Sequence, residues 1–469
     1  MTEPTNPIVS SARNTTRRAL ILTVLRLSIP AILAEISSVV MQYIDSAMVG
    51  SLGTEASASI GLVSTTTWLF GGLCVSLAIG FSVQAAQYIG AGRADEAADV
   101  FRQSLVCSLV FGLLLGGIGT LISPHLPLWL GGEQELVRDA SAYFLVYSLA
   151  LPFSLLRRLA SNMLQSSGDM KTPSILNTAM CGMDVLFNLL LIFPSGTHHL
   201  FGFRFFLPGA GLGVMGAALG TALSEAVTAV ILLYFAGFRS KELKFRPGGS
   251  WRLRKDCLAT AGKIAMPVAL ERVAMCGAQV AATTIIAPLG KVSVAANSLA
   301  VTAESFCYMP GYGIGSAAAT LVGQSIGAGE RTLAKRYAHL SVLLGALFMT
   351  VTGAIMFIIA PQLFALLTPV AQVRSLGTAV LRIEAFAEPL YAVSIVASGA
   401  LRGAGDTLIP GLLNLISMWA VRITASALLT PHFGLYGVWI AMCGELCLRG
   451  VLFLIRLLRG KWLQKSMIA

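Results

Sequence analysis

The sequence predicts an all-α integral membrane protein with twelve transmembrane helices in two parallel six-helix repeats. Charged residues make up only 12% of the chain and hydrophobic residues 55%, whereas about 25% charged residues is typical of soluble proteins. Apolar runs of about 18 residues or more, each long enough to cross a bilayer as a helix, recur from one end to the other. In addition, residues 30–177 read again, in the same order, 237 positions later.

The repeat consists of short matches that all share this single offset. They pair Pro30 with Pro267, Gln42 with Gln279, Leu52-Gly53 with Leu289-Gly290, residues 87–92 with 324–329, and residues 161–177 with 398–414. A constant offset over separate matches indicates a tandem duplication. In an apolar chain, such a duplication is typical of transporters built from two related halves.

Hydropathy and the Gly- and Pro-rich joints between apolar runs place the spans in order along the chain. They are expected near 25–49, 57–83, 101–124, 141–164, 173–194, 209–237, 260–288, 294–321, 338–360, 377–401, 409–430 and 434–457. The predicted organisation is a tail (1–18), an N-terminal six-helix lobe (19–237), a basic linker (238–257), a C-terminal six-helix lobe (258–460) and a second tail (461–469). Because each half has an even number of spans, both enter the membrane from the same side, and a pseudo-twofold axis along the membrane normal should relate them.

The net charge of +11 comes from basic residues that gather in particular loops, so no nucleic acid partner is expected. The linker alone carries seven Lys or Arg, and others lie in the first tail and after the last span. Cytoplasmic loops of membrane proteins are enriched in Lys and Arg. We therefore expect both tails and the linker in the cytoplasm of a cell whose inner (plasma) membrane holds the protein.

Ionisable residues within spans are functional candidates because they are costly in a membrane. Asp45 should lie roughly 12 Å, and Asp184 and Thr221 roughly 15 Å, from the outer surface at 1.5 Å per residue. Asp184 and Asn188 are four residues apart and share a helix face. Such hard oxygen groups suit Na⁺, or a proton shared by crowded carboxylates. The alternative is a buried polar network that only packs helices.

Other charges in the spans have structural interpretations. Arg157, Arg158 and Arg449 lie towards cytoplasmic helix ends, where their heads can reach the interface. Glu445 can pair with Arg449 one turn away. Glu271, Arg272 and Arg422 can form interhelical ion pairs.

Several motifs resemble the multidrug and toxic compound extrusion (MATE) transporters over residues 18–460. They are Pro-Ala-Ile at 30–32, Tyr-Ile-Asp-Ser-Ala-Met-Val-Gly at 43–50, Gly-Gln-Ser-Ile-Gly-Ala-Gly at 323–329 and Leu-Arg-Gly-Ala-Gly-Asp-Thr at 401–407. The resemblance implies twelve helices in two bundles. It also implies export of small amphipathic organic compounds, often cationic, in exchange for Na⁺ or H⁺.

Carried over residue by residue, the resemblance makes Asp45 the acid of the first helix and Thr221 the hydroxyl of the sixth. In the fifth helix many members carry Asn and, four residues later, Asp; here the order is reversed, as Asp184 and then Asn188. The predicted cation-coupling residues are therefore Asp45, Asp184, Asn188 and Thr221. Na⁺ at this site is the one metal ion that the sequence leads us to expect.

The C-terminal half departs from the family pattern. Some members carry a carboxylate at the positions of Met275 and Tyr391. Here Glu271 stands four residues before the first position and Glu388 three before the second, each one helical turn away on nearly the same face. These four residues are secondary candidates for cation binding.

The function expected from these patterns is secondary active multidrug export by a monomer whose two lobes already enclose a site. A lipid-linked oligosaccharide or lipid flippase of similar fold is the alternative; it would favour a larger, more cationic cleft, and the few cleft arginines argue against it. A membrane-embedded enzyme would need an acid–base or metal constellation. No nucleophile motif or P-loop occurs, and the five histidines lack metal-ligand spacing, so neither enzymatic activity nor a cofactor is expected.

Overall fold

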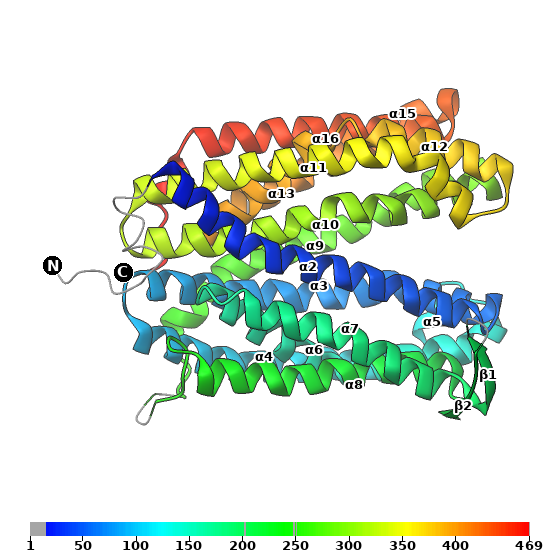
Figure 1. Cartoon of the computed structure of the whole chain (residues 1–469), viewed down its shortest axis with the longest axis horizontal. Coiled ribbons are helices and arrows are strands. Elements are labelled where there is room, and N and C mark those ends of the chain that lie inside the picture. The colour runs from blue at the N-terminus through cyan, green and yellow to red at the C-terminus, as the bar shows by residue number, and fades with distance from the viewer. Residues whose placement is uncertain (1–15, 201–202, 247–248, 250, 469) are drawn as a thin grey trace.

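The computed structural model describes residues 16–200, 203–246, 249 and 251–468, and long helices dominate it (Figure 1). Most of the predicted first tail, part of the linker and the last residue lie outside the described residues. The first half contains α2 (Arg17–Gly50), α3 (Thr54–Gly90), α4 (Ala94–Ile122), α5 (Leu126–Trp129), α6 (Gln134–Ser166), α7 (Lys171–Ile192), β1 (Pro194–Leu200), β2 (Phe203–Ala210), α8 (Gly213–Tyr234) and the π-helical turn η1 (Phe235–Arg239). The second half contains α9 (Lys255–Ile286), η2 (Ala287–Leu289), α10 (Lys291–Gly327), α11 (Arg331–Leu367), α12 (Ala371–Glu384), α13 (Glu388–Gly403), α14 (Leu408–Ile416), η3 (Ser417–Ile423), α15 (Thr424–Phe433), α16 (Leu435–Leu458) and η4 (Lys461–Gln464).

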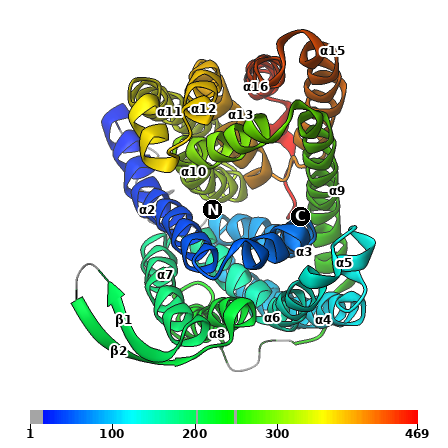
Figure 2. The same cartoon turned by 90° about the vertical axis from the view of Figure 1, so that its right-hand side faces the viewer.

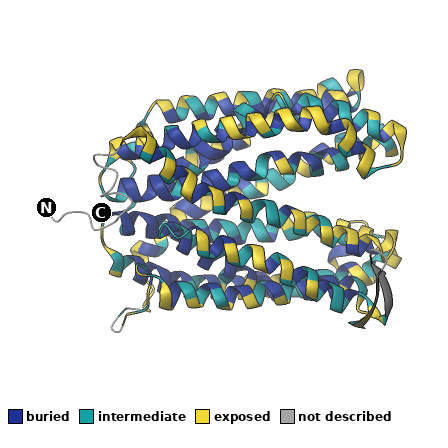
Figure 3. Cartoon of the chain, in the orientation of Figure 1, coloured by how far each residue is buried: buried dark blue, intermediate teal, exposed yellow. Residues whose placement is uncertain are grey.

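The predicted all-α membrane architecture of two repeated halves is confirmed. Among the described residues, ten helices are long and apolar enough to span a membrane. The two further predicted spans are α10 and the α12–α13 pair. Many large apolar side chains on the outward faces of the helices are exposed (Figure 3), which suits helices whose surroundings are lipid rather than water.

Two interruptions and one hairpin differ from the predicted spans. The tenth span, predicted as one helix, is broken between Glu384 and Glu388, because Pro389 in the first turn of α13 cannot continue α12. The eleventh contains the π-helical segment η3. Between the fifth and sixth spans, residues predicted as a loop form the antiparallel pair β1–β2, with Pro194 opposite Ala210, and α8 begins only at Gly213.

The backbone follows the repeat read from the sequence. Gly53 and Gly290, Gly92 and Gly329, and Gly168 and Gly405 are pairs separated by 237 residues, and all six have positive φ angles between 75° and 127°. Only glycine adopts this region readily. The joints of the two halves therefore turn in the same way, as expected of duplicated units.

The two halves form two bundles whose axes diverge towards the end of the molecule that carries the hairpin (Figure 1). We call this the hairpin end, and the opposite end, where α2 begins and η4 lies, the terminal end. Viewed from the hairpin end, α2 and α9 flank opposite sides of the boundary between the bundles (Figure 2). Each of these repeat-related helices packs on the other half, α2 on α10 and α9 on α3.

At the terminal end α3 and α10 meet through their backbones. Gln87 Nε2 donates to the Gly403 carbonyl at 3.3 Å, and Gln324 Nε2 donates to the Ser166 carbonyl at 2.7 Å. Donors and acceptors are both offset by 237 residues, so the pseudo-twofold axis relates the two bonds. A Cβ atom at Gly90 would overlap the Gln324 carbonyl, and one at Gly327 would overlap the Gln87 carbonyl. The close approach of the two helices thus requires glycine at both positions.

The C-terminal segment packs back onto this junction. Trp462 is fully buried in the core of the second half, and the Lys465 ammonium lies 2.8 Å from a carboxylate oxygen of the buried Asp406. The backbone N–H of Met467 donates to Gln87 Oε1 at 2.8 Å. These last described residues therefore contact both halves.

Replacing Gly90 or Gly327 by Ala should separate the bundles at the terminal end, because the added methyl group cannot fit against the facing carbonyl. The expected result is a longer distance between spin labels on the repeat-related exposed positions Asp95 and Thr332, measured by pulsed electron resonance in a background without the eight native cysteines. Gly117→Ala is the matched control, since a Cβ there meets nothing within 4 Å. A Gly90→Ala distance equal to that of the control would contradict this account.

Candidate functional site

Two acids from different helices of the N-terminal half share one amide group. Asn188 on α7 donates through Nδ2 to Asp45 Oδ1 on α2 at 2.9 Å and to Asp184 Oδ2, one turn earlier on α7, at 3.0 Å. Asp184 and Asn188 are fully buried, and Asp45 is partly exposed. The structure thus brings together three of the four residues predicted as the cation-coupling site.

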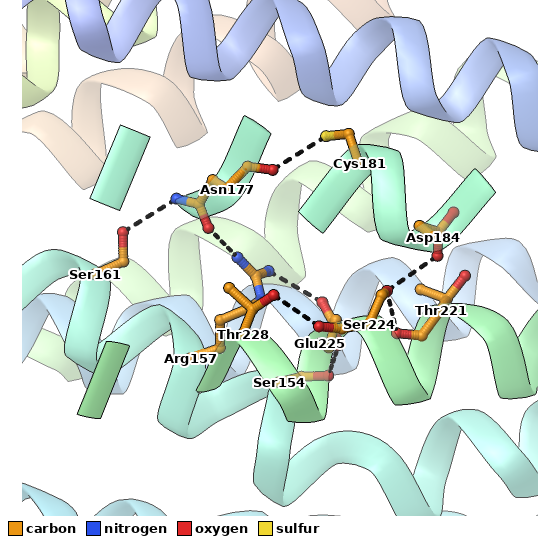
Figure 4. Close-up of polar contacts among 10 residues, drawn as sticks. All are labelled: Ser154, Arg157, Ser161, Asn177, Cys181, Asp184, Thr221, Ser224, Glu225 and Thr228. Atoms are coloured by element: carbon orange, nitrogen blue, oxygen red, sulfur yellow. Dashed lines mark hydrogen bonds and ion pairs between the residues drawn. The ribbon is translucent and has the colours of Figure 1, made fainter. Parts of the chain in front are cut away.

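Helix α8 completes this cluster with hydroxyl groups. Ser224 Oγ lies 3.1 Å from Asp184 Oδ1 and 2.9 Å from the Thr221 carbonyl, and its one proton can serve either. Thr221, the fourth predicted residue, lies beside Asp184 and Ser224 (Figure 4). The sequence analysis missed Ser224, although it lies three residues after Thr221 on nearly the same helix face.

The Asn188 side chain is held by close packing on α8. A Cβ atom at Gly220 would overlap Asn188 Oδ1, and this oxygen has no hydrogen-bond partner among the described residues. The amide therefore keeps its N–H₂ towards the carboxylates. The cluster offers carboxylate, amide and hydroxyl oxygens, the ligand types that hard cations prefer.

A second polar network on α6, α7 and α8 neutralises another acid of this half, Glu225 (Figure 4). Arg157 Nη2 lies 3.0 Å from Glu225 Oε1, and Ser154 Oγ donates to Glu225 Oε2. Arg157 Nη1 also donates to Asn177 Oδ1 at 3.0 Å. The prediction that the Arg157 head reaches the membrane interface is wrong, because this side chain is buried and paired.

A cavity of about 240 Å³ lies between the two bundles. Its wall includes residues of α2, α3 and α6 from the first half and of α9, α10, α13, α14 and α16 from the second. Three of the secondary candidates, Glu271, Met275 and Tyr391, line it, whereas Glu388 does not.

Glu271 forms its polar contacts with residues of the second half. The Arg402 Nη2 atom lies 3.0 and 3.2 Å from its two oxygens, and Asn414 Nδ2 donates to it at 2.8 Å. The interhelical pair expected for Glu271 therefore exists, with Arg402 as the partner. The pair expected between Glu445 and Arg449 is also present, at 3.1 Å.

Glu388 belongs to a buried acidic cluster beside the break in the tenth span. Glu384 and Glu388 are fully buried next to each other, and none of their four carboxyl oxygens has a hydrogen-bond partner among residues 16–468 that the structure describes. Glu304 on α10 lies close by. Glu304 was not among the predicted site residues, although it is an ionisable residue inside the span predicted at 294–321.

Replacing Glu225 by Gln should destabilise the fold by about 3–5 kcal/mol, since it leaves the buried Arg157 cation without a counter-charge. The check is the free energy of unfolding, measured by titration with a denaturing detergent. The double variant Arg157→Met/Glu225→Gln removes both charges and should recover part of the loss. A single variant as stable as the unmodified chain would show that the pair contributes nothing.

Comparison with known proteins gives the same two-part pattern. The MatE family model matches residues 30–190 and again residues 267–428. The chain is 26% identical over 450 residues to a probable multidrug resistance protein NorM of Thermotoga maritima, covering 95% of this chain and 93% of that protein. It is 28% identical over 423 residues to the probable NorM of Burkholderia pseudomallei, covering 88% and 87%.

Solved structures share the fold. An outward-facing multidrug resistance MATE family transporter of the MOP superfamily superposes with a TM-score of 0.88 at 20% identity, covering 99% of this chain and 100% of that one. A MATE crystal structure in the straight conformation gives 0.87 over the same shares, also at 20% identity. Since the family model matches most of the chain, once in each half and at the offset read from the sequence, this chain belongs to the MatE family of multidrug and toxic compound extrusion transporters.

Proposed function

We propose that this chain exports organic compounds by secondary active antiport, taking up Na⁺ or H⁺ in exchange, through alternating access to the cavity between its lobes. The observation that carries the proposal is the pair Asp45 and Asp184 sharing the Asn188 amide. In the same half, Glu225 has an arginine partner, whereas no ion pair is found for Asp45 or Asp184 among the described residues. Two neighbouring carboxylates without a counter-ion in a low-dielectric interior favour binding of a cation.

Asp45 lies on α2, so cation binding at Asp45 can change how α2 packs against other helices. Helix α2 contacts α7, which carries Asp184, and also α10 of the other half. Without a bound cation, repulsion between the carboxylates disfavours their close approach. Binding of Na⁺ or a proton removes this repulsion and favours the state in which α2 and α7 lie together. A cation drives transport only through such a difference in affinity between two states.

In this proposal the two lobes, 19–237 and 258–460, move relative to each other as rigid units. The basic linker 238–257 joins them, and the tails are residues 1–18 and 461–469. The clustering of Lys and Arg supports a cytoplasmic position of the tails and linker, on the inner face of a plasma membrane. The bundles then diverge towards the outside, so the conformation described is the outward-facing one. A monomer suffices, because one chain contributes both walls of the cavity.

The cavity suits small amphipathic compounds. Met275, Tyr312, Tyr391 and Ile395 give it apolar and aromatic surface, and Asn162 supplies a polar group. Export of such compounds is consistent with the similarity of this chain to probable multidrug resistance proteins. Cationic substrates are the expectation from the family, and Glu35 supplies an acidic side chain on the cavity wall. A lipid flippase would instead favour a larger, more cationic cleft for the head group of its lipid.

Asp45→Asn and Asp184→Asn should each abolish gradient-driven efflux while the protein still folds, because each removes a charge that attracts the cation. The measurement is ethidium export from cells and uptake into proteoliposomes under separately imposed sodium and pH gradients. Asp139→Asn, at an exposed acid at the start of α6, is the matched control. Unchanged efflux in both site variants would reject the coupling site, and the absence of gradient-dependent ethidium efflux from the wild-type protein, measured with and without an ionophore, would favour the flippase.

The double variant Asp184→Asn/Asn188→Asp restores the order found in many family members. It should retain most of the wild-type efflux, because the two positions lie one turn apart on one face and both reach towards α2. Asp184→Asn alone serves as the comparison in the same proteoliposomes. A double variant as inactive as this single variant would show that the charge must stay at position 184.

A further inference from the structure

We propose that the cavity between the lobes recognises an anionic group, a carboxylate or sulfonate carried by an amphipathic substrate, through the guanidinium group of Arg272. This inference rests on the proposed export function and names the substrate class that the cavity selects. Among the organic compounds of that proposal, it singles out those that carry an anionic group.

The cavity wall carries charges of both signs. Five ionisable residues with charged side chains line the cavity: Glu35, Glu271, Arg272, Arg402 and Arg449. Two of the three arginines are already paired within the protein, Arg402 with Glu271 and Arg449 with Glu445. Arg272, by contrast, has neither a hydrogen bond nor an ion pair to any residue within the described ranges; its Nε atom is buried without a partner, as are those of Arg402 and Arg449.

Glu35, the other carboxylate on the cavity wall, lies on α2, and no ion pair joins it to Arg272 within the described ranges. The neighbour of Arg272 in sequence, Glu271, is held by Arg402 and Asn414. Successive helix residues project in different directions, so Glu271 cannot turn back to its neighbour without breaking that network. The positive charge of Arg272 is therefore left for a ligand.

Packing fixes where this charge lies. A Cβ atom at Gly72 on α3 would come within 3.2 Å of the Cβ and Cγ atoms of Arg272. The side chain of Arg272 thus lies across the boundary between α9 and α3, with its stem against the α3 backbone. A guanidinium held in this way loses little conformational freedom when it binds, and its planar donors match the two oxygens of a carboxylate or sulfonate.

The rest of the wall suits the apolar part of such a compound. Tyr312, Tyr391 and Met275 lie on the same wall as Arg272. Burying the unpaired guanidinium Nε is costly unless an acceptor satisfies it, and a bound anionic group would supply one. An inside-negative membrane potential also favours outward movement of a negative charge.

The test is binding of two forms of one fluorescent xanthene dye to the purified protein in detergent, without any gradient: the free carboxylate and its methyl ester. The wild-type protein should bind the carboxylate with at least about tenfold lower Kd than the ester, as expected for a charge-assisted hydrogen-bonded pair. Arg272→Gln should abolish this preference by weakening the binding of the carboxylate form alone. Arg272→Lys keeps a positive charge and should retain part of the preference for the carboxylate.

Lys263→Gln is the matched control, because it removes a positive charge from an exposed position of the same helix outside the cavity. Unchanged binding of the ester to Arg272→Gln shows that the variant is folded. Equal affinity of the wild-type protein for both dyes, binding of neither, or equal weakening of both by Arg272→Gln would overturn the inference. If gradient-driven ethidium efflux persists in that case, the proposed export function stands and only the anion preference fails.

Discussion

The backbone contact between α3 and α10 at the terminal end is the constraint on which the rest of the molecule depends. Two glycines, Gly90 and Gly327, bring the helices so close that no side chain fits between them. Gln87 and Gln324 then reach across with two symmetric hydrogen bonds. Because the bundles are joined there and diverge towards the hairpin end (Figure 1), the cavity between them has a floor, and residues of both halves can face one ligand.

The distribution of ion pairs separates structural charges from those left for function. Glu225, Glu271, Asp406 and Glu445 each have a basic partner on the protein. Asp45 and Asp184 instead share a neutral amide, and Arg272 has no partner in the part of the chain that the structure describes. An unpaired charge in a low-dielectric interior costs more than a paired one. Its retention is most simply explained by a ligand that supplies the missing charge.

The duplication is preserved where the chain turns and has diverged where it carries charge. Gly168 and Gly405 keep the same positive φ, yet the acids that follow them differ in environment. Asp169 accepts from backbone N–H groups of Lys171 and Thr172, whereas Asp406 binds Arg456 and Lys465. Likewise, the acid pair of the first half has no equivalent at the repeat positions of the second, where buried glutamates gather instead at the break between α12 and α13. The two lobes thus share a backbone plan but not a chemistry.

The sequence by itself determined the membrane class, the two repeated halves, the order of the spans and the helix face shared by Asp184 and Asn188. Hydropathy, a constant offset and helical periodicity are local properties that can be read along one dimension. Only the tertiary structure decided that Asp45 meets Asn188, that Arg157 neutralises Glu225 and that Arg402, not Arg272, holds Glu271. These partners are 143, 68 and 131 residues apart in the chain. Which charges meet depends on how distant helices pack, and no local pattern records that packing.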